Sequence, residues 1–267
     1  MKIALHSLDL VWNNPEQNLH QAAEAARAAA SARVHVFPEV LATGFLTNRE
    51  DLAKVSVGPD GGEQVQFLQD LSKELQAVML CSLVVRLKDL SGSARYANRL
   101  FVVHPDGSVG CADKMHLFGL AGEDAHFEKG DRPLDFSVDG WNFRAAVCYD
   151  LRFPEAFRNA WKPTEDRPEY DVLVFVANWP DRRIAHWDAL LPARAIENQS
   201  YVVGVNRVGF DGLGIAHSGH SGVWNAWGHC LERQTEGTPG TMIVDLSRED
   251  LQDARTKLPF LKDRRFF

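Results

Sequence analysis

The feature that most constrains this chain is the repeated alternation of short apolar runs with helix-like segments. A strand covered on both faces is apolar at nearly every position, whereas a helix packed on a sheet is apolar on one side only. Runs of the first kind lie at residues 34–37, 77–87, 172–177 and 201–208, and helical spacing of apolar residues lies at 15–32, 65–75 and 184–199. This alternation predicts an α/β fold in which helices cover buried strands.

Hairpins and shorter elements complete the expected fold. The pairs 99–104 with 108–113 and 134–138 with 141–147 flank turn sequences, and they predict two hairpins. Further strands are expected at 3–10, 222–232 and 242–245, and further helices at 155–161 and after Ser247. No linker or repeat divides the 267 residues, so we expect one domain at 1–260 and a tail at 261–267.

Charge and hydropathy exclude several functional classes. The net charge is −7 and there is no basic stripe, which argues against nucleic acid as a partner. No apolar run approaches the roughly 20 residues of a membrane-spanning helix, and no secretory signal pattern is seen, so we expect a cytoplasmic protein without membrane attachment. Cys81, Cys111, Cys148 and Cys230 are scattered and form no CxxC pair, which favours free thiols.

Three strand ends carry chemically complementary side chains, namely Glu39, Lys114 and Cys148. A thiol with an ordinary pKa of about 8.5 is mostly protonated at neutral pH, so its attack on a carbonyl requires a base such as a carboxylate. The attack places negative charge on oxygen, which an ammonium group and a backbone N–H can stabilise. Lys114 and the N–H of Tyr149, the residue after the cysteine, are suited to these two roles.

Each of these residues also has a structural interpretation. A cysteine at a strand end is more often a packing residue than a nucleophile. Glu39 could cap a neighbouring helix, and Lys114 could be a solvated surface charge. Residue type alone therefore does not assign a function.

Two other chemistries find less support. The run at residues 219–223 does not match the G-x-S-x-G pattern of a serine hydrolase. His217 and His220 have no third metal ligand at convincing spacing, and a thiol mechanism needs no metal. No metal or other cofactor is therefore expected.

The segments around the three reactive residues carry a family resemblance. They read FPEVLATGF at 37–45, DKMHLF at 113–118 and CYDLRFPE at 148–155, and in this order they resemble the nitrilase or carbon–nitrogen hydrolase superfamily. The likeness extends to VANWP at 176–180 and ARAIENQ at 193–199, and it spans the chain to about Pro259. It implies a single-domain four-layer α-β-β-α sandwich that forms homodimers or higher homo-oligomers. It also implies that Glu39, Lys114 and Cys148 form a catalytic triad.

The resemblance implies a role for Glu123, which lies shortly after the lysine. In the family a second glutamate near this position helps to place the lysine and the substrate amide, so Glu123 is a candidate catalytic residue. A loop carboxylate paired with Lys129 or Arg132 is an equally good interpretation.

Charged residues near the motifs are expected to support the site. Asp150 and Arg152 would hold the loop that carries the nucleophile through charge-assisted hydrogen bonds. Arg194 and Glu197 would tie a helix to the core or to a dimer face.

Within this superfamily, the sequence motifs are most similar to those of the omega-amidases, which release ammonia from the side-chain amide of 2-oxoglutaramate or 2-oxosuccinamate. Asn178 and Trp179, at the exit of a strand, are candidates to line the substrate pocket together with Tyr149. A dicarboxylate-like substrate needs a cationic partner, for which Arg182 and Arg183 are candidates, although both could equally be solvated loop charges.

Other functions remain open. The same triad could serve another amidase, an N-carbamoyl hydrolase or a nitrilase. A scaffold protein that has lost catalysis would predict a broken triad, and the triad motifs here are intact.

Overall fold

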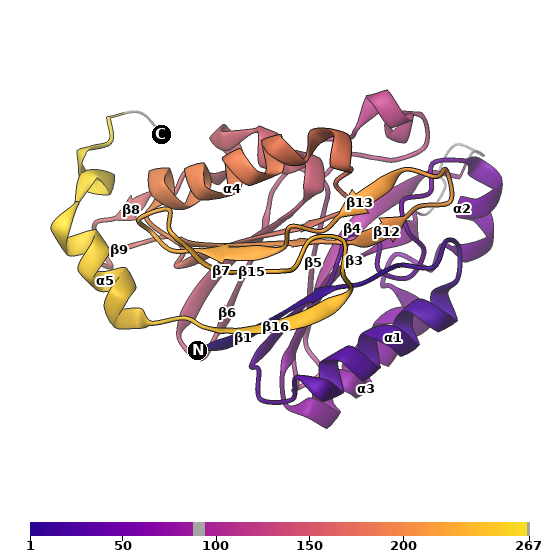
Figure 1. Ribbon diagram of the computed structural model, residues 1–267, viewed down its shortest axis with the longest axis horizontal. Helices are drawn as coiled ribbons and strands as arrows, with labels where there is room; N and C mark the ends of the chain where they lie inside the picture. The colour runs from indigo at the N-terminus through magenta and orange to yellow at the C-terminus, as the bar shows by residue number, and fades with distance from the viewer. Residues whose placement is uncertain (88–93, 266–267) are drawn as a thin grey trace.

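The computed structural model describes residues 1–87 and 94–265, and these residues form two six-stranded sheets that face each other (Figure 1). The first sheet has the order β16-β1-β2-β3-β4-β5, and the second has the order β15-β14-β11-β10-β7-β6. In the first sheet the strands are β1 (Lys2–Ser7), β2 (Val34–Val36), β3 (Val78–Arg86), β4 (Tyr96–Val103), β5 (Val109–Asp113) and β16 (Gly240–Asp245). In the second sheet they are β6 (Leu134–Val138), β7 (Trp141–Val147), β10 (Val172–Ala177), β11 (Tyr201–Asn206), β14 (Gly222–Trp224) and β15 (Cys230–Arg233).

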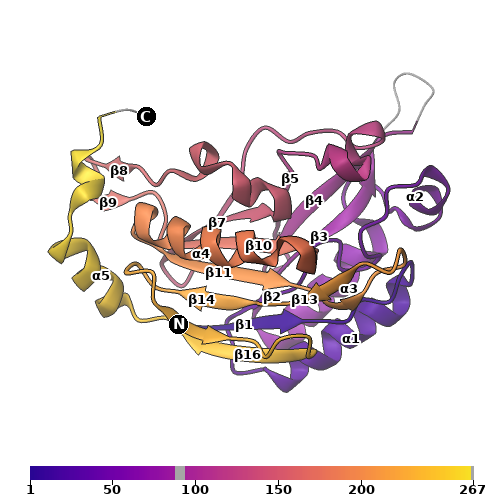
Figure 2. The same cartoon turned by 45° about the horizontal axis from the view of Figure 1, so that its top comes forward.

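Helices cover the outer faces of both sheets, which completes four layers. The helices are α1 (Pro15–Ala28), α2 (Arg49–Val55), α3 (Gly62–Leu75), α4 (Ile184–Asn198) and α5 (Arg248–Lys257). Figures 1 and 2 show α1 and α3 outside the first sheet and α4 over the second, where it contacts β11. The expected α-β-β-α sandwich is therefore confirmed, as one domain.

The core between the two sheets explains why the strand sequences are apolar at almost every position. Residues such as Leu5 and Val36 of the first sheet share one buried cluster with Val147 and Val174 of the second. The opposite face of the first sheet contributes residues such as Met79 to a second cluster, beneath α1 and α3. Each fully buried Val or Leu side chain contributes about 1.5–3 kcal/mol to folding.

Strand direction determines where the catalytic candidates emerge. β1, β2 and β3 are mutually parallel, as are β7, β10 and β11. β1 also pairs antiparallel with β16, so the first strand of the chain lies between β2 and the last strand. Because parallel strands in one sheet end on the same side, the loops after β7 and β10 lie together. The N–H of Asn178, after β10, donates to Glu39 Oε2, so the loop after β2 lies beside them.

Several local expectations differ from the structure. The helix expected at 155–161 is wrong: Pro154–Phe157 forms one 3-10 turn, and β8 (Trp161–Lys162) pairs with β9 (Arg167–Pro168). The carbonyl of Ala160 accepts the N–H of Glu169 at 2.9 Å, so this backbone joins the β8–β9 pair instead of a helix. Helix α2 and the pair β12 (Val208–Phe210) with β13 (Ala216–Ser218) were not expected.

The end of the chain packs in part against the body. Within the expected tail at 261–267, Leu261 is buried in a 3-10 turn at Phe260–Asp263, and residues 266–267 lie outside the described residues. Among the described residues, no helix combines the length and the apolar character needed to cross a membrane.

The first sheet contains a pair of buried histidines, one in β1 and one in β2. His6 Nε2 and His35 Nδ1 lie 3.0 Å apart, His6 Nδ1 lies 2.8 Å from Thr241 Oγ1, and both histidines have no exposed surface. Burial lowers the pKa of His35 to about 4, and burial together with the charge of His35 lowers the pKa of His6 well below its usual value.

Stability is therefore expected to fall as the pH falls from about 6.5 towards 4. In that window the unfolded chain binds protons at these histidines and the folded chain does not. His35 alone should remove about 2 kcal/mol of unfolding free energy between pH 7 and pH 5. His35→Gln should reduce this loss, measured by urea unfolding at both pH values, whereas exposed His20→Gln should not. Equal pH dependence in all three proteins would contradict the prediction.

Candidate active site

The candidate catalytic residues and Asn178 lie at the ends of four strands, close to one another. Glu39 lies two residues beyond Phe37, the residue that follows β2, and Lys114 directly follows β5. Cys148 directly follows β7, and Asn178 directly follows β10. The first pair comes from the first sheet and the second pair from the other, so the site lies between the ends of the two sheets.

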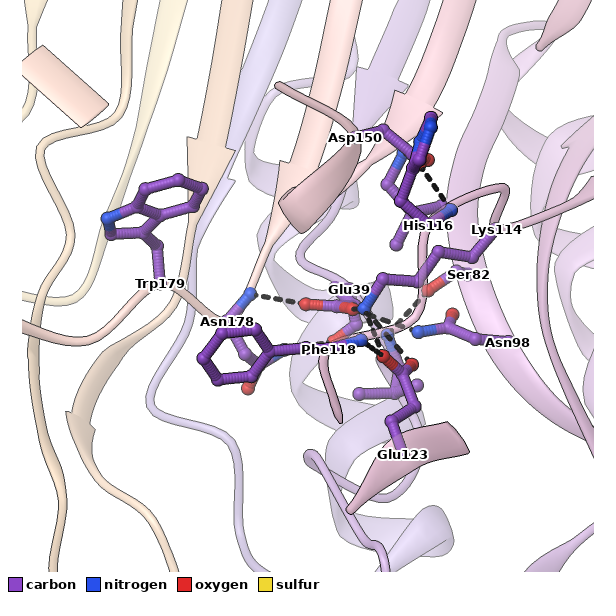
Figure 3. A network of polar contacts seen from close by, with 12 residues as sticks. Glu39, Ser82, Asn98, Lys114, His116, Phe118, Glu123, Asp150, Asn178 and Trp179 are labelled. Carbon is purple, nitrogen blue, oxygen red and sulfur yellow. Dashed lines mark hydrogen bonds and ion pairs between the residues drawn. The ribbon is translucent and has the colours of Figure 1, made fainter. Parts of the chain in front are cut away.

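Lys114 connects two carboxylates in the interior (Figure 3). Its Nζ donates to Glu39 Oε1 at 2.9 Å and to both oxygens of Glu123, at 3.0 and 2.9 Å. Glu123 also accepts the backbone N–H of Phe118 at 2.6 Å. Lys114 is 1% exposed and the two glutamates are fully buried, so the lysine is held in one position by both acids.

Glu39 is fixed by further donors. Its Oε1 also accepts from Asn98 Nδ2 at 2.8 Å, and its Oε2 accepts the backbone N–H of Asn178 at 2.8 Å. The next residue, Val40, has a φ of +45°, which is unusual for a β-branched residue, and Ser82 Oγ accepts its N–H at 2.7 Å. The backbone beside Glu39 is thus held in a strained conformation that costs about 1–3 kcal/mol.

Cys148 lies at a second strained position, with a φ of +46° at the start of a 3-10 turn, Cys148–Arg152. Asp150 holds this turn, because its Oδ2 accepts the N–H of Val147 at 3.1 Å and its Oδ1 accepts the N–H of His116 at 2.8 Å. The His116 ring stacks on Phe153 with 3.8 Å between centroids. Strain of this kind persists where the surroundings fix the backbone, as they do here.

Tyr149 follows the cysteine within the same turn. The first N–H groups of a helical turn have no partner inside the turn, so the Tyr149 N–H is available to a negatively charged oxygen near Cys148. The Tyr149 ring packs edge-on against Phe118, with 5.0 Å between centroids.

Burial and charge set the protonation states. Burial raises the pKa of Cys148 well above its usual value, and the carboxylate of Glu39 adds to this effect while Lys114 opposes it. Burial alone would lower the pKa of Lys114, but the charges of Glu123 and Glu39 outweigh it and the pKa rises. The resting site therefore holds a thiol and an ammonium group, and the thiol needs a base.

The surroundings of Glu123 shift its pKa and determine its partners. Burial raises the pKa of Glu123 above its usual value, and the charge of Glu39 acts in the same direction although Lys114 opposes both. The alternative pairing of Glu123 with Lys129 or Arg132 is not found, because its partners are Lys114 and the Phe118 N–H.

A cavity of about 220 Å³ opens over the site. It is lined by Glu39, Lys114 and Cys148 together with Tyr149, Asn178, Trp179, Arg182 and Arg183, which are the five residues expected to contact substrate. Glu123 lies behind Lys114 and is not part of this lining.

Three arginines line the cavity: Arg152, Arg182 and Arg183. The Arg152 guanidinium lies 4.8 Å from the centroid of the Trp179 ring, and that of Arg183 lies 4.8 Å from that of Phe118. Burial, followed by repulsion from Arg182, lowers the pKa of Arg183. Within residues 1–87 and 94–265, none of the three forms an ion pair with a carboxylate.

The supporting residues lie largely as expected. Asp150 holds the loop of the nucleophile, whereas Arg152 contacts aromatic rings of the cavity and His186 Nδ1 at 3.0 Å. Arg194 donates to the Leu151 carbonyl at 2.7 Å, which ties α4 to the turn that carries Cys148.

Some lining residues escaped the sequence analysis. Phe45 and Phe118 lie inside the motifs of Glu39 and Lys114, so their spacing from those residues was an available signal. Asp211, Leu213 and Ile215 come from the loop between β12 and β13, a strand pair that the sequence did not reveal, and His217 of β13 was considered only as a metal ligand.

Comparisons with known proteins show which proteins this chain is similar to. The family model for carbon–nitrogen hydrolases matches residues 2–256. The chain is 35% identical to the omega-amidase YafV of Yersinia enterocolitica, over 98% of this chain and 96% of the relative. It is 28% identical to the 2-oxoglutaramate amidase of Bacillus subtilis, again over 98% and 96%.

Solved structures show the same similarity. A CN-hydrolase superfamily protein of Xanthomonas campestris, described with an arsenic adduct in its active site, superposes with a TM-score of 0.91 at 31% identity, covering 100% of this chain and 98% of the other. A mutant amidase of Nesterenkonia sp. AN1, described with acrylamide added to its active-site cysteine, has a TM-score of 0.80 at 25% identity, with coverages of 97% and 98%.

Proposed function

This chain belongs to the carbon–nitrogen hydrolase family, and from that premise we propose that Cys148 is the nucleophile of an amide hydrolysis. The chain is a hydrolase of carbon–nitrogen bonds other than peptide bonds. The observation that carries the proposal is that Cys148, Glu39 and Lys114 line the same cavity. Lys114 also donates to Glu39 there.

In the first step Glu39 takes the thiol proton and the sulfur of Cys148 adds to the amide carbon. The carbonyl oxygen becomes negatively charged, and the Lys114 ammonium and the Tyr149 N–H stabilise it. Glu123 holds Lys114 from behind, because both of its oxygens accept from Nζ. Its role is therefore to position the lysine.

After the addition step, Glu39 acts first as an acid and then again as a base. Glu39 donates its proton to the departing nitrogen, so that ammonia leaves and a thioester of Cys148 remains. Glu39 then removes a proton from water, which attacks the thioester carbon and releases the acid. The thiol is restored with the proton that Glu39 took from water.

The substrate we propose is the side-chain amide of 2-oxoglutaramate or 2-oxosuccinamate. Two features support it: relatives named omega-amidase at 35% and 36% identity with one named 2-oxoglutaramate amidase at 28%, and the three arginines of the cavity. An arginine side chain can bind a carboxylate through two parallel hydrogen bonds. Because the three arginines lack carboxylate partners among the described residues, they are free to bind the acid groups of such a substrate.

Ammonia release from a panel of substrates tests this assignment. We expect kcat/KM to be highest for 2-oxoglutaramate or 2-oxosuccinamate, and lower for asparagine-like amides, carbamoyl-amino acids and nitriles. Arg183→Met should reduce kcat/KM for the omega-amides more than for an uncharged amide. A preference for a carbamoyl compound or a nitrile would overturn the substrate assignment and leave the cysteine mechanism standing.

Asn178 supplies a further element of amide recognition in this proposal. Its Nδ2 donates to the Glu39 backbone carbonyl, which fixes the side-chain orientation, while its Oδ1 is buried and has no partner within the described residues. A primary amide offers two N–H donors, and Oδ1 can accept one of them.

Asn178→Ala is therefore expected to lower kcat/KM for an amide about tenfold more than for the methyl ester of the same acid, which has no N–H to donate. Both substrates are measured with the same variant, so any disturbance of Glu39 affects both. An equal loss for amide and ester would show that Asn178 acts only through Glu39.

The family resemblance also supports a homodimer or higher homo-oligomer, and the absence of a secretory signal pattern in the sequence supports a cytoplasmic location. Sedimentation of the purified protein at assay concentration measures the assembly, and a monomer there would contradict that part of the proposal.

A further inference from the structure

Lys114 and the two glutamates that it contacts form a buried group whose charges do not balance. Lys114 Nζ donates to Glu39 at 2.9 Å and to both oxygens of Glu123, at 3.0 and 2.9 Å. Among residues 1–87 and 94–265, Lys114 is the only cation that pairs with either carboxylate. The remaining donors to the two carboxylates are one side-chain amide and two backbone N–H groups, all neutral. With both glutamates ionised, the group holds two negative charges and one positive charge.

Water does little to screen this excess negative charge. Lys114 is 1% exposed, and Glu39 and Glu123 are 0% exposed. Charges interact more strongly where water is excluded, because the effective dielectric constant is lower there. Burial raises the pKa of Glu123, and the charge of Glu39 raises it further although Lys114 opposes both. A third carboxylate placed beside this group would meet the same repulsion.

The two glutamates differ in their relation to the catalytic cavity. Glu39 lines the cavity together with Cys148, whereas Glu123 is not part of the lining and reaches it only through Lys114. Glu123 is therefore not expected to touch a bound substrate. It can act on one through its charge and through the position of Lys114.

The proposed reaction changes the charge of the group that lies beside Cys148 and Glu39. The substrate brings a neutral amide to this place. The acid also forms there without charge, because one hydrogen of the attacking water stays on its oxygen. A carboxylic acid with a pKa of about 4 then ionises in neutral water. The free product is thus an anion at the position where the substrate is neutral.

We propose that Glu123 makes the active site select the amide over the acid product, because its charge exceeds what Lys114 can balance and repels the carboxylate that hydrolysis creates. This inference rests on the proposed function. Substrate and product share the carboxylate that the arginines of the cavity attract, so the arginines do not distinguish them. The charge of Glu123 would therefore keep the released acid from returning to the site.

Equilibrium binding to Cys148→Ala tests the proposal, because this variant keeps the buried group and is not expected to consume the substrate. The two ligands are 2-oxoglutaramate and 2-oxoglutarate, which differ only in –NH₂ against –O⁻. Isothermal titration calorimetry at neutral pH gives both Kd values. We expect the amide to bind at least about tenfold more tightly than the acid. Adding Glu123→Gln should bring the two Kd values to within about twofold of each other.

Two further variants in the Cys148→Ala background separate charge from position. Glu123→Asp keeps the charge on a shorter side chain, so it should keep the preference for the amide. Asp166→Asn removes a negative charge from a side chain that is 85% exposed, and it should keep the preference as well. A movement of Lys114 would weaken both ligands, whereas the loss of charge changes the ratio of their Kd values.

A preference that survives Glu123→Gln, or one that Glu123→Asp loses to the same extent, would overturn the inference. Equal Kd values for amide and acid in Cys148→Ala would also overturn it. Neither result bears on whether the wild-type protein releases ammonia from amides. Failure of this inference and failure of the proposed function are therefore separate results.

Discussion

Replacement of Cys148 by alanine is expected to abolish ammonia release, with a loss of at least about 10⁴-fold in kcat. The reason is that every step of the proposed route passes through a bond to this sulfur. The fold should persist, because alanine removes one atom from a turn that Asp150 holds through the Val147 and His116 N–H groups.

Intact-mass measurement makes this prediction specific. Wild-type protein mixed with substrate and quenched rapidly should carry an acyl adduct that maps to Cys148, and Cys148→Ala should carry none. Cys230→Ala, which changes an exposed cysteine, is the matched control and should keep both the adduct and the turnover. An adduct on another residue, or turnover by Cys148→Ala near that of wild type, would end the assignment.

Glu39→Gln is expected to give the second-largest effect, a fall in kcat of about 10²- to 10⁴-fold. Gln keeps the size of the side chain but cannot take the thiol proton. The three groups around this carboxylate, Lys114 Nζ, Asn98 Nδ2 and the Asn178 N–H, are all donors, so an amide –NH₂ must face one of them. A lower Tm should accompany the loss of activity.

Glu123→Gln is the matched comparison for this variant. It also changes a buried carboxylate bound to Lys114, but it lies outside the cavity lining, so its effect on kcat should be smaller. Steady-state ammonia release gives kcat and KM for both variants. If Glu123→Gln lost more kcat than Glu39→Gln, the roles of base and positioning residue would have to be exchanged.

The layers of the fold could be predicted because their cause is local in the sequence. Strands such as β10 and β11 are covered on both faces, so each is a continuous apolar run. Helix α2 escaped prediction because Leu52 is its only buried residue, which leaves no helical periodicity to detect. The β12–β13 pair is short and is joined by a loop whose form depends on Asp211, whose Oδ1 accepts two backbone N–H groups.

The sequence indicated which residues form the candidate site, but it did not indicate the contacts between them. Glu39, Lys114 and Cys148 lie at strand ends within recognisable motifs, and these signals belong to the sequence. These three side chains lie together because the two sheets pack face to face, and no local sequence pattern encodes that packing. The bond between Lys114 and Glu123 and the unpartnered Oδ1 of Asn178 follow from that packing and became visible only with it.

The pairing of β1 with β16 has a consequence for synthesis of the protein. Ser7 lies opposite Gly240, and Lys2 lies opposite Asp245, so β1 leaves the ribosome long before its partner strand β16. Until then one edge of β1 lacks its partner strand, and an open edge can pair with other chains. The nascent polypeptide therefore completes its first sheet only after β16 has been synthesised, and its protection from aggregation depends on that late closure.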